Sequence, residues 1–313
     1  MVKWITKSEE ASISDYGTYP GSRSDEELLK KGVIILDKPS GPTSHQVDAW
    51  IKDICNVKKA SHGGTLDPRV TGVMVIALED STKLMPILLG VKKEYVALVN
   101  LHKEVPVSDI KKVCNEFVGK IKQLPPVKSA VARRVRERKV YYLEIIEIDG
   151  RNILMRVGCE AGTYIRRLAD DIGKKLGVGA HLQELRRTKS GKFTEKDLVT
   201  LHDVIDAFQE NKIRDVVHPL EIIADKMPSV VIKDTAVDAI CNGAPVMLSG
   251  IVRFTDNIKK GDVVAILSQK GEMVAFGDAK TDYEQMIERK RGSVIKTDRV
   301  IMKKGTYPKM WKR

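Results

Sequence analysis

Residues 61–73 read Ser-His-Gly-Gly-Thr-Leu-Asp-Pro-Arg-Val-Thr-Gly-Val, the least ordinary stretch of the chain. Two glycines precede Asp67, Pro68 restricts the backbone after it, and Gly72 opens an apolar run that predicts a strand. A carboxylate on such a turn is held still and exposed, as a nucleophile requires. The same residues suit an Asx-turn, in which Asp67 only bonds its own backbone. The stretch alone leaves both interpretations open.

Two other aspartate chemistries are harder to place on this stretch. A phosphatase-like nucleophile would need a second carboxylate two residues later, where Arg69 stands. Glycoside hydrolysis needs a paired acid, and the sequence does not locate one.

The residues before this stretch predict a strand, a fixed turn and a helix. Residues 33–36 are an unbroken apolar run, typical of a buried strand. Residues 38–42, with two prolines and a glycine, predict a turn. Thr43 with Gln46 three residues later predicts a capping box, and apolar residues at helical spacing follow up to residue 54.

The residues after this stretch predict a β-rich region and a second helix. Apolar residues at helical spacing run from Thr163 to Leu176, with Gly173 and Gly177 available to end the helix. The expected strands are 95–101, 141–148 and 153–159.

Near residue 226 the pattern changes to short apolar runs between glycines, which predicts a small barrel-like domain. These runs cover 229–232, 246–248, 261–267 and 272–277. From Met286 onward ten basic residues face two acidic ones, which predicts a basic tail. We therefore expect an extension at 1–31 that packs on the second domain, a main domain at 32–226, and a small domain with its tail at 227–313.

Composition narrows the class of protein. The formal net charge of +12 favours a polyanionic partner such as nucleic acid, although lysine-rich surfaces also serve solubility. The four cysteines never form a C-x-x-C pair and no His/Cys cluster completes a zinc site, so we expect no metal. The N-terminus lacks the apolar core of a signal peptide, and the longest apolar run, 73–78, is too short for a membrane span. We expect a cytoplasmic protein without a cofactor.

Several motifs in order resemble the TruB class of pseudouridine synthases. The segment 63–72 is similar to the motif that holds the catalytic aspartate of that class, and 38–44 to its opening motif. Further matches are Lys93-Glu94-Tyr95, Gln123-Leu124-Pro125-Pro126, Gly162-Thr163-Tyr164-Ile165-Arg166 and Leu185-Arg186-Arg187-Thr188. The resemblance implies an α+β fold, with a mixed, mainly antiparallel sheet and flanking helices, followed by a small β-barrel of the PUA type.

The resemblance also implies roles for individual residues. Asp67 matches the nucleophile, which attacks uracil C6 or ribose C1′ so that the base detaches, rotates and rejoins through C5. Arg166 matches the arginine that pairs with this carboxylate and would hold it ionised. Tyr95 matches the tyrosine that stacks on the target base. Outside the motifs, Arg166 would be read as a surface residue and Tyr95 as a strand residue.

Weaker matches extend this site. Tyr164 and Leu185 match pocket residues, although either also suits a core position. His62 stands where relatives place an RNA-contacting histidine, and a lone histidine is more often structural. Six basic residues face one acidic residue at 128–139, where the family has a loop that grips RNA. The arginines expected to bind RNA there are Arg133, Arg134, Arg136 and Arg138.

The polar extension and the full C-terminal domain resemble the dyskerin group, the catalytic subunits of box H/ACA ribonucleoproteins. This branch implies a guide RNA, a substrate rRNA or tRNA, a small zinc-binding protein and a protein that assists substrate turnover. A stand-alone tRNA pseudouridine-55 synthase would use the same catalytic residues. A non-catalytic RNA-binding scaffold is the alternative of another class.

Overall fold

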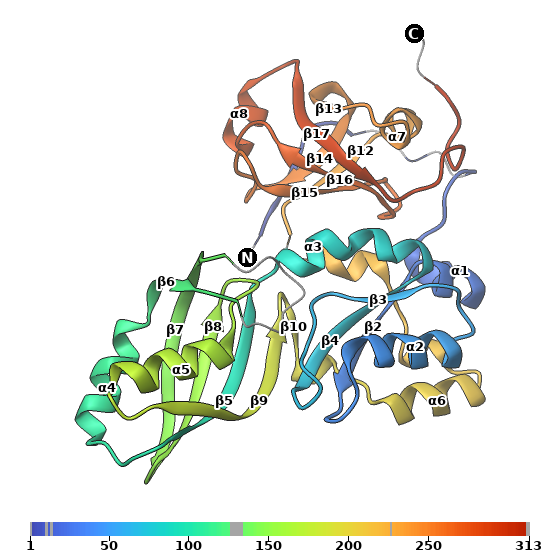
Figure 1. Cartoon of the computed structure of the whole chain (residues 1–313). Helices are drawn as coiled ribbons and strands as arrows, with labels where there is room; N and C mark the ends of the chain where they lie inside the picture. The colour runs from blue at the N-terminus through green and yellow to red at the C-terminus, as the bar shows by residue number, and fades with distance from the viewer. Residues whose placement is uncertain (1, 10–11, 13–14, 126–133, 226, 311–313) are drawn as a thin grey trace. The chain divides into compact units, whose positions relative to one another are not determined.

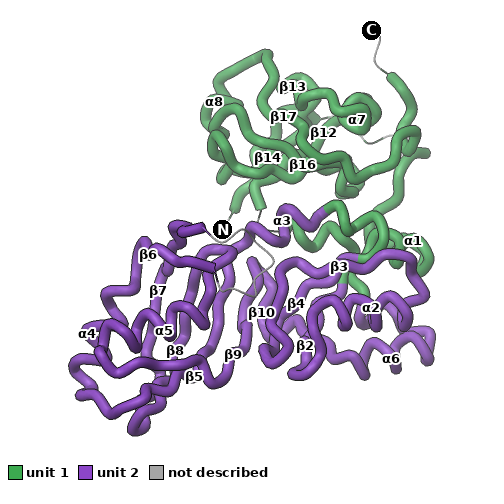
Figure 2. The backbone as a smooth tube through the Cα atoms, in the orientation of Figure 1, with its two compact units in different colours: residues 1–33, 78–83, 217–313 green, residues 34–77, 84–216 purple. Residues whose placement is uncertain are grey.

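A computed structural model of the chain describes all residues except 1, 10–11, 13–14, 126–133, 226 and 311–313. The Cα positions group into two compact units (Figure 2). Unit 1 comprises 1–33, 78–83 and 217–313; unit 2 comprises 34–77 and 84–216. The α+β fold expected from the resemblance is confirmed, with strands and helices in both units.

Unit 2 is built on a mixed sheet whose strands follow the order β2-β4-β9-β5-β8-β7-β6 (Figure 1). β4 and β9 are parallel, whereas β9, β5, β8, β7 and β6 pair antiparallel in turn. The strands are β2 (Gly32–Lys38), β4 (Thr71–Leu78), β5 (Lys93–Leu101), β6 (Gly119–Gln123), β7 (Arg136–Asp149), β8 (Asn152–Cys159) and β9 (Ala180–Ser190). Two short strands are added at β4 and β9, β3 (Ala60–His62) and β10 (Phe193–Thr194).

Helices flank this sheet because each has one apolar stripe to bury. α5 buries Ile165, Leu168, Ala169 and Ile172 in the same core as β5 and β8. The helices of unit 2 are α2 (Ser44–Ile54), α3 (Met85–Gly90), α4 (Val107–Glu116), α5 (Ile165–Lys175) and α6 (Leu201–Gln209). The short 3-10 helices of unit 2 are η3 (Glu195–Asp197) and η4 (Ile213–Asp215). A third, η2 (Glu79–Leu84), belongs to unit 1 except for its last residue.

The two predicted helices form, with one difference. The capping box before α2 is confirmed, since Gln46 N–H donates to Thr43 Oγ1 at 3.1 Å and Gln46 Oε1 accepts from Thr43 N–H at 2.8 Å. Gly173 does not end α5 but lies inside it, because a Cβ there would come within 2.2 Å of Ala180 N. Gly177 follows the helix with a φ of +73°, the conformation that favours glycine.

Unit 1 is built on a seven-stranded sheet in the order β1-β14-β12-β15-β16-β17-β13. Its strands are β1 (Trp4–Thr6), β12 (Ser229–Ile232), β13 (Val246–Met247), β14 (Ile251–Thr255), β15 (Val263–Leu267), β16 (Met273–Ala279) and β17 (Ser293–Val300); β11 (His218–Pro219) pairs with the start of β2. The helices are α1 (Asp25–Lys30), α7 (Asp234–Cys241) and α8 (Tyr283–Glu288), with 3-10 helices η1 (Pro20–Ser22), η5 (Leu220–Ala224) and η6 (Leu248–Gly250).

Residues near the N-terminus pack within unit 1. β1 pairs antiparallel with β14, and Lys3 N–H donates to Asp256 Oδ1 at 2.9 Å. Thr18 N–H donates to Glu272 Oε1 at 3.1 Å. The domain boundaries at residues 31 and 226 stay predictions.

The residues from Met286 to Val300 correct the expectation of a basic tail. They complete α8 and form β17, which lies between β16 and β13 in the sheet. The high charge of this segment concealed the strand, because the apolar residues that β17 buries are few and include Val294 and Ile295. Among the described residues, no helix is long and apolar enough to cross a membrane.

Candidate active site

Asp67 and Arg166, 99 residues apart in the chain, form an ion pair through Asp67 Oδ2 and an Arg166 terminal nitrogen. Arg166 lies in the first turn of α5, and Asp67 lies between β3 and β4. The two side chains are 55% and 56% exposed. An ion pair this exposed contributes little to folding stability. Both side chains are instead open to contact with a molecule outside the protein.

The segment around Asp67 is fixed by hydrogen bonds along its length; we call residues 63–70 the Asp67 loop. Gly63 N–H donates to Val75 O at 2.8 Å, and Gly41 N–H donates to Pro68 O at 2.9 Å. The Ser44 hydroxyl accepts from Leu66 N–H at 2.9 Å and donates to Leu66 O at 3.0 Å. The loop therefore presents the Asp67 carboxylate from a rigid backbone.

Buried cations beneath the Asp67 loop bond backbone carbonyls. Lys38 Nζ donates to the carbonyls of Pro68 and Val70, each at 3.0 Å. Arg187, 1% exposed, donates from Nε to Val73 O at 2.7 Å and from a terminal nitrogen to Gly64 O at 3.0 Å.

Lys93 is a third buried cation, and its Nζ donates to Leu88 O at 2.9 Å. Burial lowers the pKa of Lys93 to about 7, with the charge of Arg187 contributing. Burial also lowers the pKa of Lys38. Arg187 and Lys38, which bond carbonyls of the loop, therefore give the Asp67 loop a positively charged floor, which favours a carboxylate or a phosphate above it.

Gly72 shows why a glycine ends this stretch. Its φ is +102°, and a Cβ there would lie 2.2 Å from the carbonyl oxygen of Arg187. Gly72 pairs with Arg187 where β4 and β9 run parallel. No other residue type fits this close approach without moving a backbone.

Tyr95 lies on β5, directly across from Arg187 of β9, and is 9% exposed. Burial raises the pKa of Tyr95, so the phenol remains protonated at neutral pH. Leu185 lies across from Ala97 on the same two strands and packs, half-buried, against the same core. Tyr95 and Leu185 therefore come from neighbouring strands of one sheet.

Tyr164 precedes α5 and is held by its backbone. Gln123 Nε2 donates to Tyr164 O at 3.1 Å, and Tyr164 N–H donates to Gln123 Oε1 at 3.0 Å. These two hydrogen bonds fix the start of α5, and so the direction of Arg166, two residues further along the chain. The contact links two of the motifs that the sequence places 41 residues apart.

The basic stretch reaches the same region from β7. Arg134 is exposed, and Arg136 and Arg138 are the first and third residues of β7. Arg138 lies 3.8 Å from Glu160, in the turn that precedes α5. Arg133 lies outside the described residues.

His62 is buried, with Asp48 at one ring nitrogen and Thr65 at the other. Contact with RNA would require the ring to leave both bonds. The sequence motifs assign no role in the site to four residues that the structure places there: Asp48, Thr65, Arg187 and Lys93. Asp48 could have been noticed as a charged residue beside Val47 on the apolar side of a predicted helix; Arg187 and Lys93 lie inside recognised motifs.

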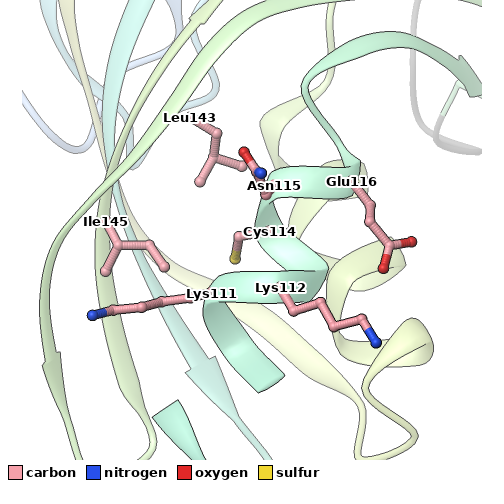
Figure 3. Close-up of a pocket in the computed structure, with 7 residues that line it drawn as sticks. All are labelled: Lys111, Lys112, Cys114, Asn115, Glu116, Leu143 and Ile145. Atoms are coloured by element: carbon pink, nitrogen blue, oxygen red, sulfur yellow. The ribbon is translucent and has the colours of Figure 1, made fainter. Parts of the chain in front are cut away.

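A separate hollow of about 720 Å³ lies between α4 and β7 (Figure 3). Leu143 and Ile145 of β7 face α4 across it. Its lining also includes Lys111, Lys112, Cys114, Asn115 and Glu116. None of the predicted site residues that the structure describes lines it.

Family models match nearly the whole chain. The N-terminal domain of TruB family pseudouridylate synthase matches residues 52–165, and the C-terminal domain of tRNA pseudouridylate synthase B matches 166–224. A PUA domain matches 228–301, and a DKCLD (NUC011) domain matches 1–48.

Curated relatives match at full length. A probable tRNA pseudouridine synthase B from Methanopyrus kandleri is 53% identical, over 98% of this chain and 93% of the relative. The protein with the same name in Methanocaldococcus jannaschii is 48% identical, over 99% of this chain and 94% of the relative.

Solved structures agree. A chain of an H/ACA RNP bound to a substrate RNA containing 2′-deoxyuridine is 46% identical and superimposes with a TM-score of 0.90, over 99% of this chain and 98% of that one. A chain of a Cbf5-Nop10-Gar1 complex is 47% identical with a TM-score of 0.90, over 98% and 96%. With its motifs, its fold and its full-length relatives in agreement, the chain belongs to the TruB family of pseudouridine synthases.

Proposed function

We propose that this pseudouridine synthase acts as the catalytic subunit of a box H/ACA ribonucleoprotein, converting specific uridines of ribosomal RNA to pseudouridine in the cytoplasm. The observation that carries the proposal is the full-length likeness to chains of H/ACA complexes, which includes the N-terminal extension and the PUA domain. A likeness confined to the catalytic domain would support only the shared chemistry.

The site supports the assigned roles. Asp67 attacks the base or its sugar, and Arg166 holds the carboxylate ionised and in place. Tyr95 of β5 stacks on the detached base, and Leu185 lies on the neighbouring strand β9. Tyr164 orients the start of α5. The reaction is a redox-neutral isomerisation, so these side chains need only bind, attack and move a proton.

Basic residues supply the RNA contacts. Arg134, Arg136 and Arg138 lead toward the turn before α5, where Arg138 approaches Glu160. Arg133 is proposed with them on sequence alone. By likeness to the solved complexes, the partners are a guide RNA and small proteins similar to Nop10 and Gar1.

The second candidate is stand-alone modification of tRNA. The curated relatives are named probable tRNA pseudouridine synthase B, and the same catalytic residues would suffice. This candidate differs from the first in its need for guide RNA and not in its chemistry.

The test is pseudouridine formation by the purified full-length protein, first with a tRNA alone and then with a guide-matched substrate, guide RNA and the small proteins. We expect guide-dependent product, and a loss of several orders of magnitude in Asp67→Asn. Asp53→Asn makes the same chemical change at an exposed position of α2 and serves as the matched control.

Each outcome separates the candidates. Product from tRNA alone, with none from the guided substrate, would assign the stand-alone function. An active Asp67→Asn variant would remove Asp67 from the mechanism. If the wild-type protein bound RNA but formed pseudouridine in no combination, the scaffold interpretation would replace both.

A further inference from the structure

His62, at the end of β3, connects helix α2 to the Asp67 loop. Its Nδ1 lies 2.6 Å from Asp48 Oδ2, and its Nε2 lies 3.0 Å from Thr65 Oγ1. The His62 and Asp48 side chains are 6% and 11% exposed. The Asp48–His62–Thr65 chain of hydrogen bonds therefore runs from the interior to a residue two positions before Asp67.

Helix α2 holds the Asp67 loop at two consecutive residues. Ser44 bonds both backbone groups of Leu66, and Asp48 holds Thr65 through His62. Ser44 and Asp48 are four residues apart, so they lie on the same face of the helix, one turn from each other. A single turn of α2 thus sets the backbone that leads into Asp67.

Asp48 has a feature that packing does not explain. Its Oδ1 is buried and has no hydrogen-bond partner among the described residues. Burying a carboxylate without full hydrogen bonding is costly. A valine would avoid that cost, so the carboxylate at this position indicates a function beside His62.

The hydroxyl of Thr65 is what connects this chain to the Asp67 loop. When Nδ1–H donates to Asp48, the ring accepts from the Thr65 hydroxyl at Nε2. The contact therefore requires a hydroxyl at position 65, which a serine keeps and a valine removes.

Among the described residues, His45 of α2 also lies beside the His62 ring, with ring centroids 5.1 Å apart. His45 Nδ1 also lies 3.9 Å from Asp48 Oδ2, but its side chain is 84% exposed. The donor atoms of His45, Asp48 and His62 lie within 4.8 Å of one another, so a bound divalent metal ion is the competing explanation.

We propose that Asp48, His62 and Thr65 are positioning residues, which fix the Asp67 loop for attack. The proposal rests on the role of Asp67 in the proposed function, and it is independent of whether a guide RNA is needed.

The experiment measures single-turnover pseudouridine formation with the full-length protein and whichever RNA it modifies. The variants are Asp48→Asn, His62→Gln, Thr65→Val and Thr65→Ser, with Asp53→Asn as the matched control on α2. We expect the first three to lower the rate about tenfold or more at saturating RNA, with RNA affinity unchanged. Thr65→Ser, which keeps the hydroxyl, should stay within about threefold of wild type.

Two readouts exclude a purely structural role. The first is rescue by the conservative variant: Thr65→Val, which keeps the size of threonine and loses the hydroxyl, should be slow, and Thr65→Ser should stay near the wild-type rate. Amide hydrogen exchange at Leu66 and Asp67, measured without RNA, should accelerate in Thr65→Val and not in Asp53→Asn. This second readout still tests the positioning if the wild-type protein forms no product, an outcome that would refute only the proposed function.

Three results would overturn the proposal. Weaker RNA binding at an unchanged single-turnover rate would make His62 an RNA contact. Equal losses in Thr65→Ser and Thr65→Val would make the chain structural only. Loss of activity in EDTA that Zn²⁺ restores, with His45→Ala as inactive as Asp48→Asn, would show a metal site.

Discussion

Two clusters of buried charge, one in each compact unit, are held in different ways. In unit 1, Arg23 is 2% exposed and forms two hydrogen bonds of 2.7 Å with the Glu221 carboxylate, so the buried charges cancel. In unit 2, the buried cations Lys38, Lys93 and Arg187 donate to backbone carbonyls.

The difference follows from what each unit has to hold. A buried bidentate ion pair fixes geometry and leaves no field behind. Cations bonded to carbonyls fix the backbone equally well, and the guanidinium of Arg187 also keeps its charge. That charge lies under the Asp67 loop, where an ionised nucleophile and RNA phosphates both gain from it. The pair in unit 1 thus serves structure alone, and the charge under the loop also serves the chemistry.

The largest effect is expected from breaking the pair in unit 1. Arg23→Met leaves the Glu221 carboxylate buried without its cationic partner. The other described hydrogen bond to Glu221, from Met273 N–H at 2.9 Å, does not neutralise the carboxylate charge. We expect a loss of about 3–5 kcal/mol in the free energy of unfolding, measured by urea unfolding followed through hydrogen exchange of the unit 1 strands.

The control for this variant is an exposed pair in the same unit. Lys30→Met breaks the Lys30–Glu26 contact of 2.6 Å, whose side chains are 51% and 79% exposed. We expect a loss of at most about 1 kcal/mol. A loss for Arg23→Met no greater than this would contradict the distinction between the two units.

A pH-dependent effect is expected from Lys93. Its pKa is about 7 in the folded protein and about 10.4 in an unfolded chain. Between these values the unfolded chain binds a proton that the folded chain does not. The free energy of unfolding therefore rises with pH through this window, by up to about 1.4 kcal/mol per pH unit. Below pH 7 both states are protonated and the penalty is constant.

Lys93→Met should remove this slope, so the variant gains stability relative to wild type as the pH falls from 10 to 7. Urea unfolding at pH 7, 8.5 and 10 measures it. Lys92→Met changes the exposed neighbour and should leave the slope intact. Parallel stability curves for wild type and Lys93→Met would show that Lys93 does not titrate in this window.

Sequence patterns predicted local structure where local physics determines it. The capping box of α2 was expected from residues close in the chain, and so were the strands β2, β4, β5, β7, β8, β12, β13, β15 and β16. The strands β9 and β14 were not expected, and β17 was missed because its charge resembles that of a tail, although it pairs with β16. Gly173 was one of two glycines available to end α5, and its close approach to Ala180, which requires a glycine, is a tertiary contact.

The site was predictable in part. The pairing of Asp67 with Arg166 came from resemblance, because no local pattern relates two residues 99 positions apart. The floor of buried cations and the Asp48–His62–Thr65 chain depend on which strand and helix faces meet. Those contacts are set by tertiary packing and have no periodicity that a sequence can show.

The smallest effect is expected at Lys7, which tests whether burial or bonding gives carbonyl-bound cations their importance. Lys7 Nζ donates to the carbonyls of Met286, Ile287 and Arg289 at 3.0, 3.1 and 3.2 Å, at the end of α8. Its bonding resembles that of Lys38, but it lies partly exposed at a helix C-terminus. Lys7→Met should lower the free energy of unfolding by about 0.5–1 kcal/mol, and by less at high salt, as measured by hydrogen exchange in α8.

A loss above about 3 kcal/mol, comparable to breaking a buried ion pair, would mean that the bonds to carbonyls matter more than burial. The positive floor beneath Asp67 would then be no more than a way of holding the loop.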